Sequence, residues 1–441
     1  MKTGQIRLHI ILACVGLLTL PATGHAQLTF ITNNGAITIT GYTNLPSNAV
    51  VVIPGTTNNW PVTSIGESAF SHDTNLASVS IPNSITNIGY NAFYFCTGMT
   101  NVTMGTNVQT IGSSAFESCW QLHSVTIPKS VTNVGDDLFQ SSGLGSVTID
   151  NNAIGSQEFY SCGGLTNAAI STNVTSIGTY AFGGCSFTNI VIPNSVTNIG
   201  PGAFWFTYLQ SVTISDGVIA IGGGAFQGTR LTSIAIPSSI TSIGDIAFNS
   251  CDSLTNIEVD VSNLYFSSVN GILFDKNQTT LVQYPGGLGG SYTVPNGTDN
   301  IGEYAFANCD LLTSVYFDGN APTTDWTAFY ADNNVTAYYL TGTSGWADFS
   351  AESGVTAVLW NPQAQTADGS FGIGTNGFGF NIAGSSNLVI VVEAATNLAN
   401  PLWSPVSTNS LNTVVGTNGV SYFSDPQWAN YSSRFYRFSS P

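Results

Sequence analysis

A short pattern, Ile-Gly-x-x-Ala-Phe, recurs along most of this 441-residue chain. Copies begin at Ile65, Ile88 and Ile111, and most later copies follow at steps of 22 or 23 residues, with one step of 20 and one gap of 58. A fixed period of this length predicts a solenoid in which each repeat forms one coil. Looser or full copies begin at Val134, Ile154, Ile177, Ile199, Ile221, Ile243 and Ile301.

A second pattern, Leu-x-x-Val/Ile-x-Ile, lies between these copies and predicts a strand. In the stretch 76–81, apolar Val79 and Ile81 alternate with small Ser78 and Ser80, as in a half-buried strand. Pro82 has no amide hydrogen and ends the ladder. The strands of successive coils therefore stack in parallel, with their apolar residues in columns.

The rest of the coil is predicted to be a bend followed by a short helical turn. In the copy at 88–96, Gly89 is expected to permit a sharp bend, and Ala92 and Phe93 to begin the turn, with Cys96 on the same side. Stacked coils bury continuous apolar columns, worth ~1.5–3 kcal/mol per fully buried side chain. The residues that define the repeat in two successive coils are Ile88, Gly89, Ala92, Phe93, Cys96, Ile111, Gly112, Ala115, Phe116 and Cys119.

The combined pattern, L-x-x-[IV]-x-[IV]-P with I-G-x-x-A-F-x-x-C, resembles the BspA-type leucine-rich repeats of bacterial secreted and surface proteins. The resemblance implies a β-rich solenoid of parallel strands and short helical turns, and a β-hairpin in the variant repeat at about 259–300. A small all-β module is expected at the C-terminal end. The expected divisions are a signal peptide (1–26), an N-terminal β cap (27–60), the solenoid (61–318), its C-terminal cap (319–360), a Gly/Asn/Ser-rich linker (361–377) and the β module (378–441).

The first 26 residues have the features of a secretory signal. Lys2 and Arg7 precede an apolar run, and Gly24 and Ala26 are small residues where a signal peptidase would cut. Cys14 offers lipidation as the alternative, but the apolar run continues past it. We therefore expect a secreted chain (extracellular, periplasmic or attached to the cell surface) without a transmembrane segment.

Charge excludes some partners. Residues 27–441 hold five basic and 24 acidic residues, a formal charge of −19, which argues against binding nucleic acid or anionic membranes. Only 7% of residues are charged, so the surface is expected to consist mainly of Ser, Thr, Asn and Gly. This composition suits a β-rich protein of the cell exterior.

All six cysteines after the signal follow a repeat phenylalanine by three residues. The same slot holds Asp73, Ser142, Thr207 and Thr229 in other coils, which favours a small hydrogen-bonding side chain over a nucleophile. Neighbouring coils bring Cys96 beside Cys119 and Cys162 beside Cys185, within the range a disulfide tolerates. Parallel Cβ vectors are poor disulfide geometry, so packed free thiols are predicted, with disulfides as the alternative.

Catalytic and metal-binding patterns are missing from the sequence. His72 and His123, the two histidines after the signal, lie about two coils apart, and no H-E-x-x-H, G-x-S-x-G or phosphate-loop pattern occurs. Acidic residues such as Glu258 and Asp260 lack a repeated ligand spacing and are interpreted as solvated. We expect no enzyme activity, no cofactor and no metal.

Two surfaces remain as candidates for binding. The first is the solvent face of the strands, a nearly uncharged ladder of hydroxyls and amides that runs from Ser78 and Ser80 to Ser314 and Tyr316. The second gathers after the helical turn, where aromatic side chains either pack on neighbouring coils or make contacts. Its members are Tyr94, Phe95, Trp120, Tyr160, Trp205, Phe206 and Tyr208.

The sequence therefore favours a non-enzymatic repeat protein, and the resemblance implies adhesion or protein–protein binding at the cell exterior. A glycan-binding module is one alternative and predicts a row of exposed tryptophans. A purely structural envelope protein is another, and it predicts a surface with neither an aromatic patch nor a pocket. The oligomeric state is left open.

Overall fold

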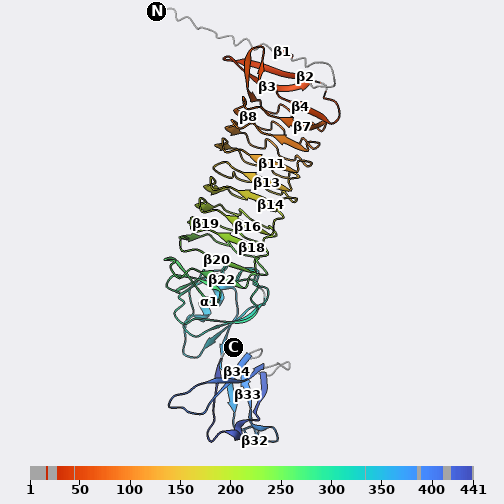
Figure 1. Ribbon diagram of the computed structural model, residues 1–441. Coiled ribbons are helices and arrows are strands. Elements are labelled where there is room, and N and C mark those ends of the chain that lie inside the picture. Colours follow the sequence, from red (N-terminus) through yellow and green to blue (C-terminus); the bar gives the residue numbers. More distant parts are fainter. Residues whose placement is uncertain are drawn as a thin grey trace, which may run out of the picture. The chain divides into compact units, whose positions relative to one another are not determined.

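Successive repeats form coils that stack on one another through parallel backbone pairing, as Figure 1 shows for the coils between β7 and β22. The chain divides into two compact units, Met1–Phe266 and Ser267–Pro441. The solenoid predicted from the repeat is confirmed. This computed structural model describes residues 16–17, 27–43, 45–332, 334–384, 389–410 and 419–439, so the predicted signal peptide lies outside it except for Gly16–Leu17.

One side of each coil in the first unit is a strand built from the Leu-x-x-Val/Ile-x-Ile pattern. Equivalent residues pair in register, as Val125 does with Val147, and inward residues are buried while their neighbours are exposed. The strands of this side are β4 (Ala49–Val52), β7 (Leu76–Ser80), β9 (Asn101–Thr103), β11 (Ser124–Ile127), β13 (Ser146–Ile149), β14 (Asn167–Ile170), β16 (Asn189–Ile192), β18 (Ser211–Ile214), β20 (Ser233–Ile236) and β22 (Asn256–Val259).

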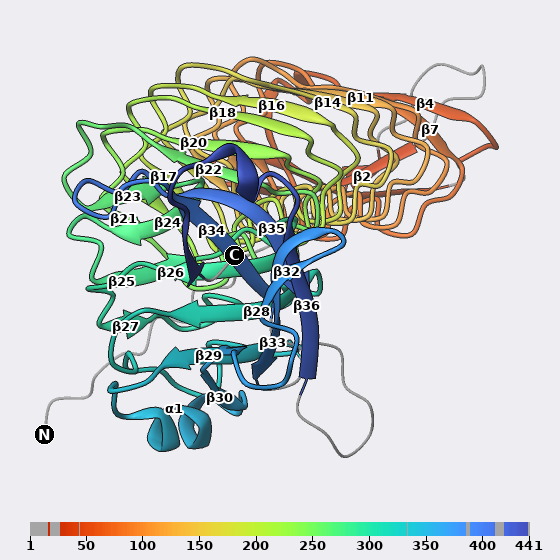
Figure 2. The same cartoon turned by 90° about the horizontal axis from the view of Figure 1, so that it is seen from below.

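A second side of the coil carries a short strand that ends at the repeat isoleucine. Equivalent residues again pair in parallel, as Ile88 does with Ile111. The strands here are β6 (Trp60–Ile65), β8 (Asn87–Ile88), β10 (Thr110–Ile111), β12 (Asn133–Val134), β15 (Ser176–Ile177), β17 (Asn198–Ile199), β19 (Ala220–Ile221) and β21 (Ser242–Ile243). Figure 2 shows the coils as nested loops.

The third side, predicted as a short helical turn, consists of consecutive hydrogen-bonded turns. In the coil at 88–96, Asn91 and Phe95 have left-handed φ angles of 54° and 58°. Tyr94 N–H donates back to Asn91 within the coil. Alternate amides donate instead to the next coil: Asn91 to Ser113 O (3.1 Å), Phe93 to Ala115 O (2.8 Å) and Phe95 to Glu117 O (2.9 Å). All three sides of the coil are therefore hydrogen-bonded to their neighbours.

The repeat glycine serves a close approach between coils, which corrects the expectation of a sharp bend. Gly89 is not among the residues with positive φ. A Cβ atom at Gly89 would lie 2.7 Å from the carbonyl carbon of Gly66, and one at Gly112 would lie 2.5 Å from Tyr90 N. A side chain at this position would push the stacked coils apart.

Repeat phenylalanines form a stacked column through the first unit. Neighbouring rings are nearly parallel and their centroids are 5.0–5.9 Å apart, the offset-stacked range. In the N-terminal cap, Tyr42 continues the column on Phe70 at 5.6 Å. The column comprises Phe70, Phe93, Phe116, Phe139, Phe159, Phe182, Phe204, Phe226 and Phe248.

The N-terminal cap is an antiparallel pair that continues the short-strand side. β2 (Gln27–Asn33) pairs with β3 (Ala36–Thr43), and β3 pairs in parallel with β6. β1 (Gly16–Leu17) pairs with β2, and β5 (Thr56–Thr57) pairs with β6. The cap covers the backbone edge that a first coil would otherwise leave open.

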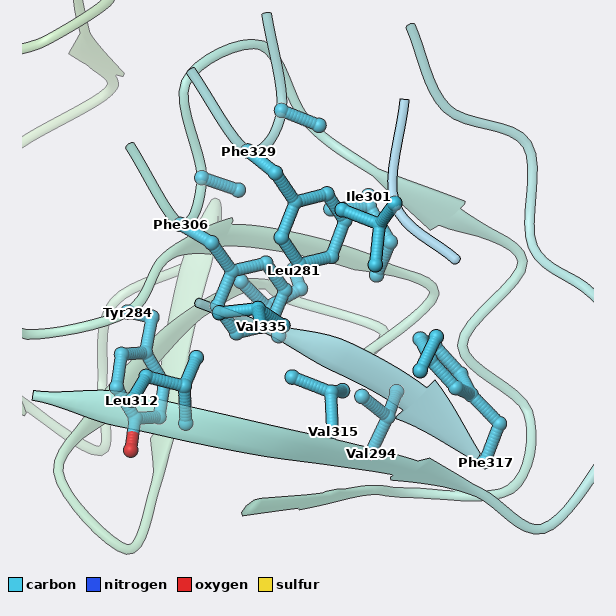
Figure 3. Close-up of a cluster of buried hydrophobic side chains, with 14 of the residues drawn as sticks. Leu281, Tyr284, Val294, Ile301, Phe306, Leu312, Val315, Phe317, Phe329 and Val335 are labelled. Atoms are coloured by element: carbon cyan, nitrogen blue, oxygen red, sulfur yellow. The ribbon is translucent and has the colours of Figure 1, made fainter. Parts of the chain in front are cut away.

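The second unit begins with the variant repeat and contains further coils of its own. β24 (Ile272–Asp275) and β25 (Thr280–Gln283) form the antiparallel hairpin that the sequence predicts there. Tyr284 takes the place of a repeat phenylalanine, 5.3 Å from Phe306, which stacks on Phe329 at 4.7 Å (Figure 3). The other elements are β23 (Phe266–Val269), β26 (Gly290–Val294), β27 (Asn300–Ile301), β28 (Leu312–Phe317), β29 (Thr336–Leu340), β30 (Ala357–Trp360) and α1 (Trp346–Ser353).

The remaining strands form a small two-sheet module. One sheet contains β31 (Gln363–Gln365), β32 (Gly372–Gly374), β33 (Gly377–Gly384) and β36 (Gly419–Asp425); the other contains β34 (Val389–Ala395), β35 (Ser404–Ser410) and β37 (Phe435–Ser439). A short 3-10 helix, η1 (Trp428–Asn430), precedes β37. Figure 2 shows β33 beside β36 and β34 beside β35.

The segment 361–377 is part of this module, which corrects the linker expected there. β31 and β32 both lie in it, and both pair with β33. The Gly, Asn and Ser content of this segment is compatible with a linker and with short edge strands. Hydrogen bonding to β33 makes the segment part of the sheet, and composition does not predict that pairing.

One coil carries a buried carboxyl group in the core. Glu158 occupies the slot that holds Ala92 and Ala115 in other coils, and its side chain is fully buried. Oε2 accepts a hydrogen bond from Gly155 N–H (2.6 Å), whereas Oε1 has no partner. Burial raises the pKa of Glu158 to about 8, and the bond from Gly155 opposes the rise.

Truncating one ring of the phenylalanine column should destabilise the first unit strongly. We expect Phe116→Ala to lower the free energy of unfolding by about 3–5 kcal/mol, because it removes two stacked contacts and leaves a cavity. Urea unfolding followed by circular dichroism measures the change. Gln121→Ala, at an exposed position of the same coil, is the control and should change stability little.

The buried carboxyl should make stability fall as the pH rises. Because the pKa of Glu158 in the folded chain exceeds its ordinary value, the unfolded chain loses this proton first. Stability therefore declines between about pH 4.5 and about pH 8. In this range, each pH unit should lower the free energy of unfolding by up to about 1.4 kcal/mol because of Glu158. We expect Glu158→Gln to lose this dependence on pH. Melting temperatures measured across this range, with exposed Glu258→Gln as the control, give the difference; equal slopes for the two variants would contradict the assignment.

Candidate functional site

An aromatic cluster lies on the turn side of the first coils. Phe95 contacts the edge of Trp120 with ring centroids 5.0 Å apart, and His72 lies 5.2 Å from Tyr94 and 5.4 Å from Phe95. The Trp120 side chain is 57% exposed. These four residues, called here the Trp120 cluster, come from three successive coils, so the fold brings together side chains that are far apart in sequence.

A second aromatic cluster lies on the same side further along the first unit. The Trp205 ring lies 4.6 Å from Phe206, 5.9 Å from Tyr180 and 6.3 Å from Tyr160. Phe206 is 52% exposed, whereas Trp205 is half-buried. These four residues are called the Trp205 cluster. Tyr208 is exposed beside it and stacks with the Arg230 guanidinium at 4.4 Å.

Sequence reasoning missed two members of these clusters. His72 and Tyr180 complete the clusters, and they were missed because only the Phe, Tyr and Trp residues that follow a repeat phenylalanine were counted. Tyr180 stands two residues after the repeat glycine, and its ring reaches Tyr160 of the preceding coil and Trp205 of the following one. Comparing positions one period apart would have suggested the contact.

Four of the clustered residues have a left-handed backbone conformation, including His72 with a φ angle of 62°. Phe95, Phe206 and Tyr180 have left-handed φ angles of 58°, 50° and 50°. At the positions of Phe95 and Phe206, other coils carry small residues, among them Ser118, Ser141, Ser161, Ser250, Gly184 and Gly228. A left-handed conformation costs roughly 1–2 kcal/mol for a residue with a bulky side chain. Packing of the coil does not require aromatic rings here.

The solvent face of the strands is hollowed over β9, β11 and β13. A shallow groove of about 680 Å³ is lined there by the predicted ladder residues, including Thr103, Thr126 and Thr148. Lys129 and Asp150 are its charged residues. Small hydroxyl side chains make few strong contacts, so this groove is a weaker candidate than the aromatic clusters.

At the end of the ladder the prediction of a solvent-exposed face is wrong. Ser314 and Tyr316 of β28 are buried, with Tyr316 only 2% exposed. Tyr316 and Tyr338 pack against the C-terminal module, and the Tyr316 hydroxyl donates to Val389 O (3.4 Å). Strand alternation identifies which face a residue occupies, but it does not reveal that a later segment covers that face.

The repeat-defining residues are core residues and line no site. Apart from the two glycines, each of those predicted for the coils at Ile88 and Ile111 is fully buried. The thiol of Cys96 donates to Phe70 O (3.1 Å), and that of Cys119 donates to Phe93 O (3.3 Å). The cysteine slot thus satisfies a backbone carbonyl of the preceding coil, whereas Thr207 in the same slot donates to Phe204 O of its own coil (3.0 Å).

All six cysteines of the described residues are buried and outside disulfides, as predicted. Burial raises the pKa of Cys119 to about 12 and that of Cys162 and Cys251 to about 11. Burial also raises the pKa of Cys96 and Cys185. Thiols with a raised pKa and no solvent access are poor nucleophiles.

In the part of the chain that the structure describes, the histidines and acidic residues do not form a metal site. His72 and His123 are both exposed. Within the described ranges, no group of three or more His, Cys, Asp or Glu side chains is placed to hold a metal ion. The only α-helix in those ranges, α1, has eight residues, and no described helix is long and apolar enough to span a membrane.

Comparison with known proteins now identifies the repeat. The family described as BspA type leucine rich repeat region (6 copies) matches residues 53–153, 152–272 and 290–345. This chain belongs to the BspA-type leucine-rich repeat family. Among curated proteins no sequence matches it significantly.

A solved structure supports the fold. A leucine-rich repeat protein from Bacteroides ovatus is 20% identical with a TM-score of 0.56, and the match covers 77% of this chain and 99% of that one. A leucine rich cell surface protein from Faecalibacterium prausnitzii is 23% identical over 78% of this chain and 94% of that one, with a TM-score of 0.40.

The cysteines should behave as buried, unpaired thiols. In residues 27–441 we expect all six to react with Ellman's reagent in concentrated guanidinium chloride and to react far more slowly in the folded chain. Dithiothreitol should leave the melting temperature unchanged. A mass increase of two hydrogens on reduction of the unfolded chain would instead show a disulfide.

Proposed function

We propose that this BspA-type protein is a secreted or cell-surface scaffold that binds a protein partner, without catalysis, through the Trp120 and Trp205 clusters. The observation that carries the proposal is the left-handed backbone of Phe95 and Phe206. Aromatic side chains stand there at an energetic cost, in positions where the fold itself accepts serine or glycine. A cost of this kind is common at binding sites.

The composition of the clusters supports a protein partner. Tryptophan, tyrosine and arginine are the residues that contribute most to protein interfaces, and Trp120, Tyr208 and Arg230 are all accessible here. The cell-surface location of the relative from Faecalibacterium prausnitzii and the predicted signal peptide support a partner outside the cell.

The two alternatives predict different surfaces. A glycan-binding module predicts a row of exposed tryptophans, whereas Trp120 and Trp205 belong to different clusters and Trp205 is half-buried. A purely structural envelope protein predicts neither an aromatic patch nor a pocket. The exposed rings of Trp120 and Phe206 therefore favour a binding scaffold over both.

Phe95→Gly separates a binding role from a packing role. Glycine relieves the left-handed strain while removing the ring, so the free energy of unfolding should differ by less than about 1 kcal/mol from that of the matched variant Ser118→Gly. Binding to an array of bacterial surface and extracellular matrix proteins should weaken about tenfold or more in Phe95→Gly alone.

A glycan array forms the second arm of the same experiment. Binding to glycans alone would support the glycan-binding alternative, and binding to neither array would favour the structural one. If Phe95→Gly is much less stable than Ser118→Gly, the ring serves packing and the proposal loses its main support.

A further inference from the structure

The two sheets of the C-terminal module are linked along one side only, and the module is called here an open barrel. Its two sheets face each other across a core of Phe380, Ile382 and Phe423 from one sheet and Ile390 and Val392 from the other. On the closed side, β35 and β36 are linked through the Asn409 side chain. Its Nδ2 donates to Tyr422 O (3.2 Å) and Ser421 Oγ (3.1 Å).

The opposite side has two unpaired strand edges. Within the described residues, β37 pairs with β34 alone, and β31 and β32 pair with β33 alone. β31 and β32 follow one another along the same edge of β33, opposite residues 381–383 and 377–379 respectively. Backbone N–H and C=O groups along such an edge can pair with an added strand.

A groove of about 910 Å³ runs along these edges. Four consecutive residues of β37, Phe435 to Phe438, line it, and so do the consecutive residues 371–373 around β32. Alternate residues of a strand point to opposite faces, so a pocket on one face would be lined by every second residue. Lining by consecutive residues places the groove along the strand edges.

The walls of the groove are aromatic and apolar. Phe378 of β33 and Tyr436 of β37 both line the groove, and their rings stack with centroids 5.4 Å apart. Ile373 is 69% exposed, and Phe371 is also exposed. This is core-like surface that the incomplete barrel leaves uncovered, and exposed apolar surface of this extent marks a site of interaction.

Two arginine–carboxylate pairs lie at the rim of the groove. Arg437 contacts Glu393 (2.6 Å) and lies over the Trp403 ring, while Arg434 contacts Asp425 (2.5 Å). In each pair the arginine is the more exposed partner, at 49% against 14% and 13% against 1%. Each arginine is paired with a carboxylate, so the two pairs together carry no net charge.

We propose that the module binds an extended peptide segment of a partner protein, which adds to β37 as a further strand and fills the open side of the barrel. Unpaired backbone groups on the edge give the strand its hydrogen bonds, and the groove takes its apolar side chains at alternate positions. β37 has five residues, so the paired stretch spans roughly 16 Å.

The surface favours a strand over other ligands. An acyl chain would fill apolar space but leave the backbone edges of β37 and β32 unpaired. A sugar would likewise leave these backbone edges unpaired. This site lies in the C-terminal module and is independent of the Trp120 and Trp205 clusters.

Phage display with the folded chain of residues 27–441 tests the proposal. A library of random peptides of about ten residues, long enough to cover β37, should yield sequences with apolar residues at every second position. Enrichment should be lost with Ile373→Lys, at an exposed groove position, and kept with Val420→Lys, at an exposed position of β36 on the closed side.

Two measurements on an enriched peptide decide the binding mode. Methylation of alternate backbone nitrogens should weaken binding at least tenfold, because it removes the hydrogen bonds to the strand edge, and hydrogen exchange of residues 435–439 should slow when the unmodified peptide binds. The proposal is overturned if no sequence is enriched, if both lysine variants behave alike, or if the methylated peptide binds equally well.

Discussion

Backbone hydrogen bonds between neighbouring coils set the spacing on which the rest of this structure depends. They run on all three sides of the coil: between the long strands, between the short strands and between the turns. Each coil is therefore displaced from the last by a nearly constant step, and equivalent side chains come to lie directly over one another. The stacked phenylalanine rings, 5.0–5.9 Å apart, result from this step. The same step leaves no room for a Cβ atom at Gly89 or Gly112.

The consensus residues of the repeat are sufficient to pack and hydrogen-bond each coil. A residue that departs from the consensus at a cost in stability therefore indicates a role other than packing. Glu158 breaks the alanine slot with a buried carboxyl group, and Phe95 breaks the small-residue slot with a ring at positive φ. Both departures have a free-energy cost that a consensus repeat would avoid. Only the second reaches the surface, which is why the binding proposal rests on it. Cysteine is a departure in appearance alone, since its thiol hydrogen-bonds to a backbone carbonyl, as the hydroxyl of Thr207 does in the same slot.

The BspA-type solenoid could be predicted from the residues, because a periodic sequence in a periodic fold makes each local prediction many times over. The cysteine slot could be interpreted in the same way. The role of the glycine could not, since bending and close approach both favour glycine and only the position of the neighbouring coil distinguishes them. The segment 361–377 was likewise ambiguous: the same small residues serve linkers and the edge strands β31 and β32.

The period, the inward columns, the slot of the cysteines and the membership of the repeat family follow from the order of residues alone, because stacking converts sequence spacing directly into contact. The two aromatic clusters, the burial of Tyr316 and the open side of the C-terminal barrel were decided only in three dimensions. Each depends on which non-repeating segment meets which surface. The sequence repeat does not determine these contacts. The surfaces with which this protein is proposed to bind therefore depend on packing between segments that are distant in sequence.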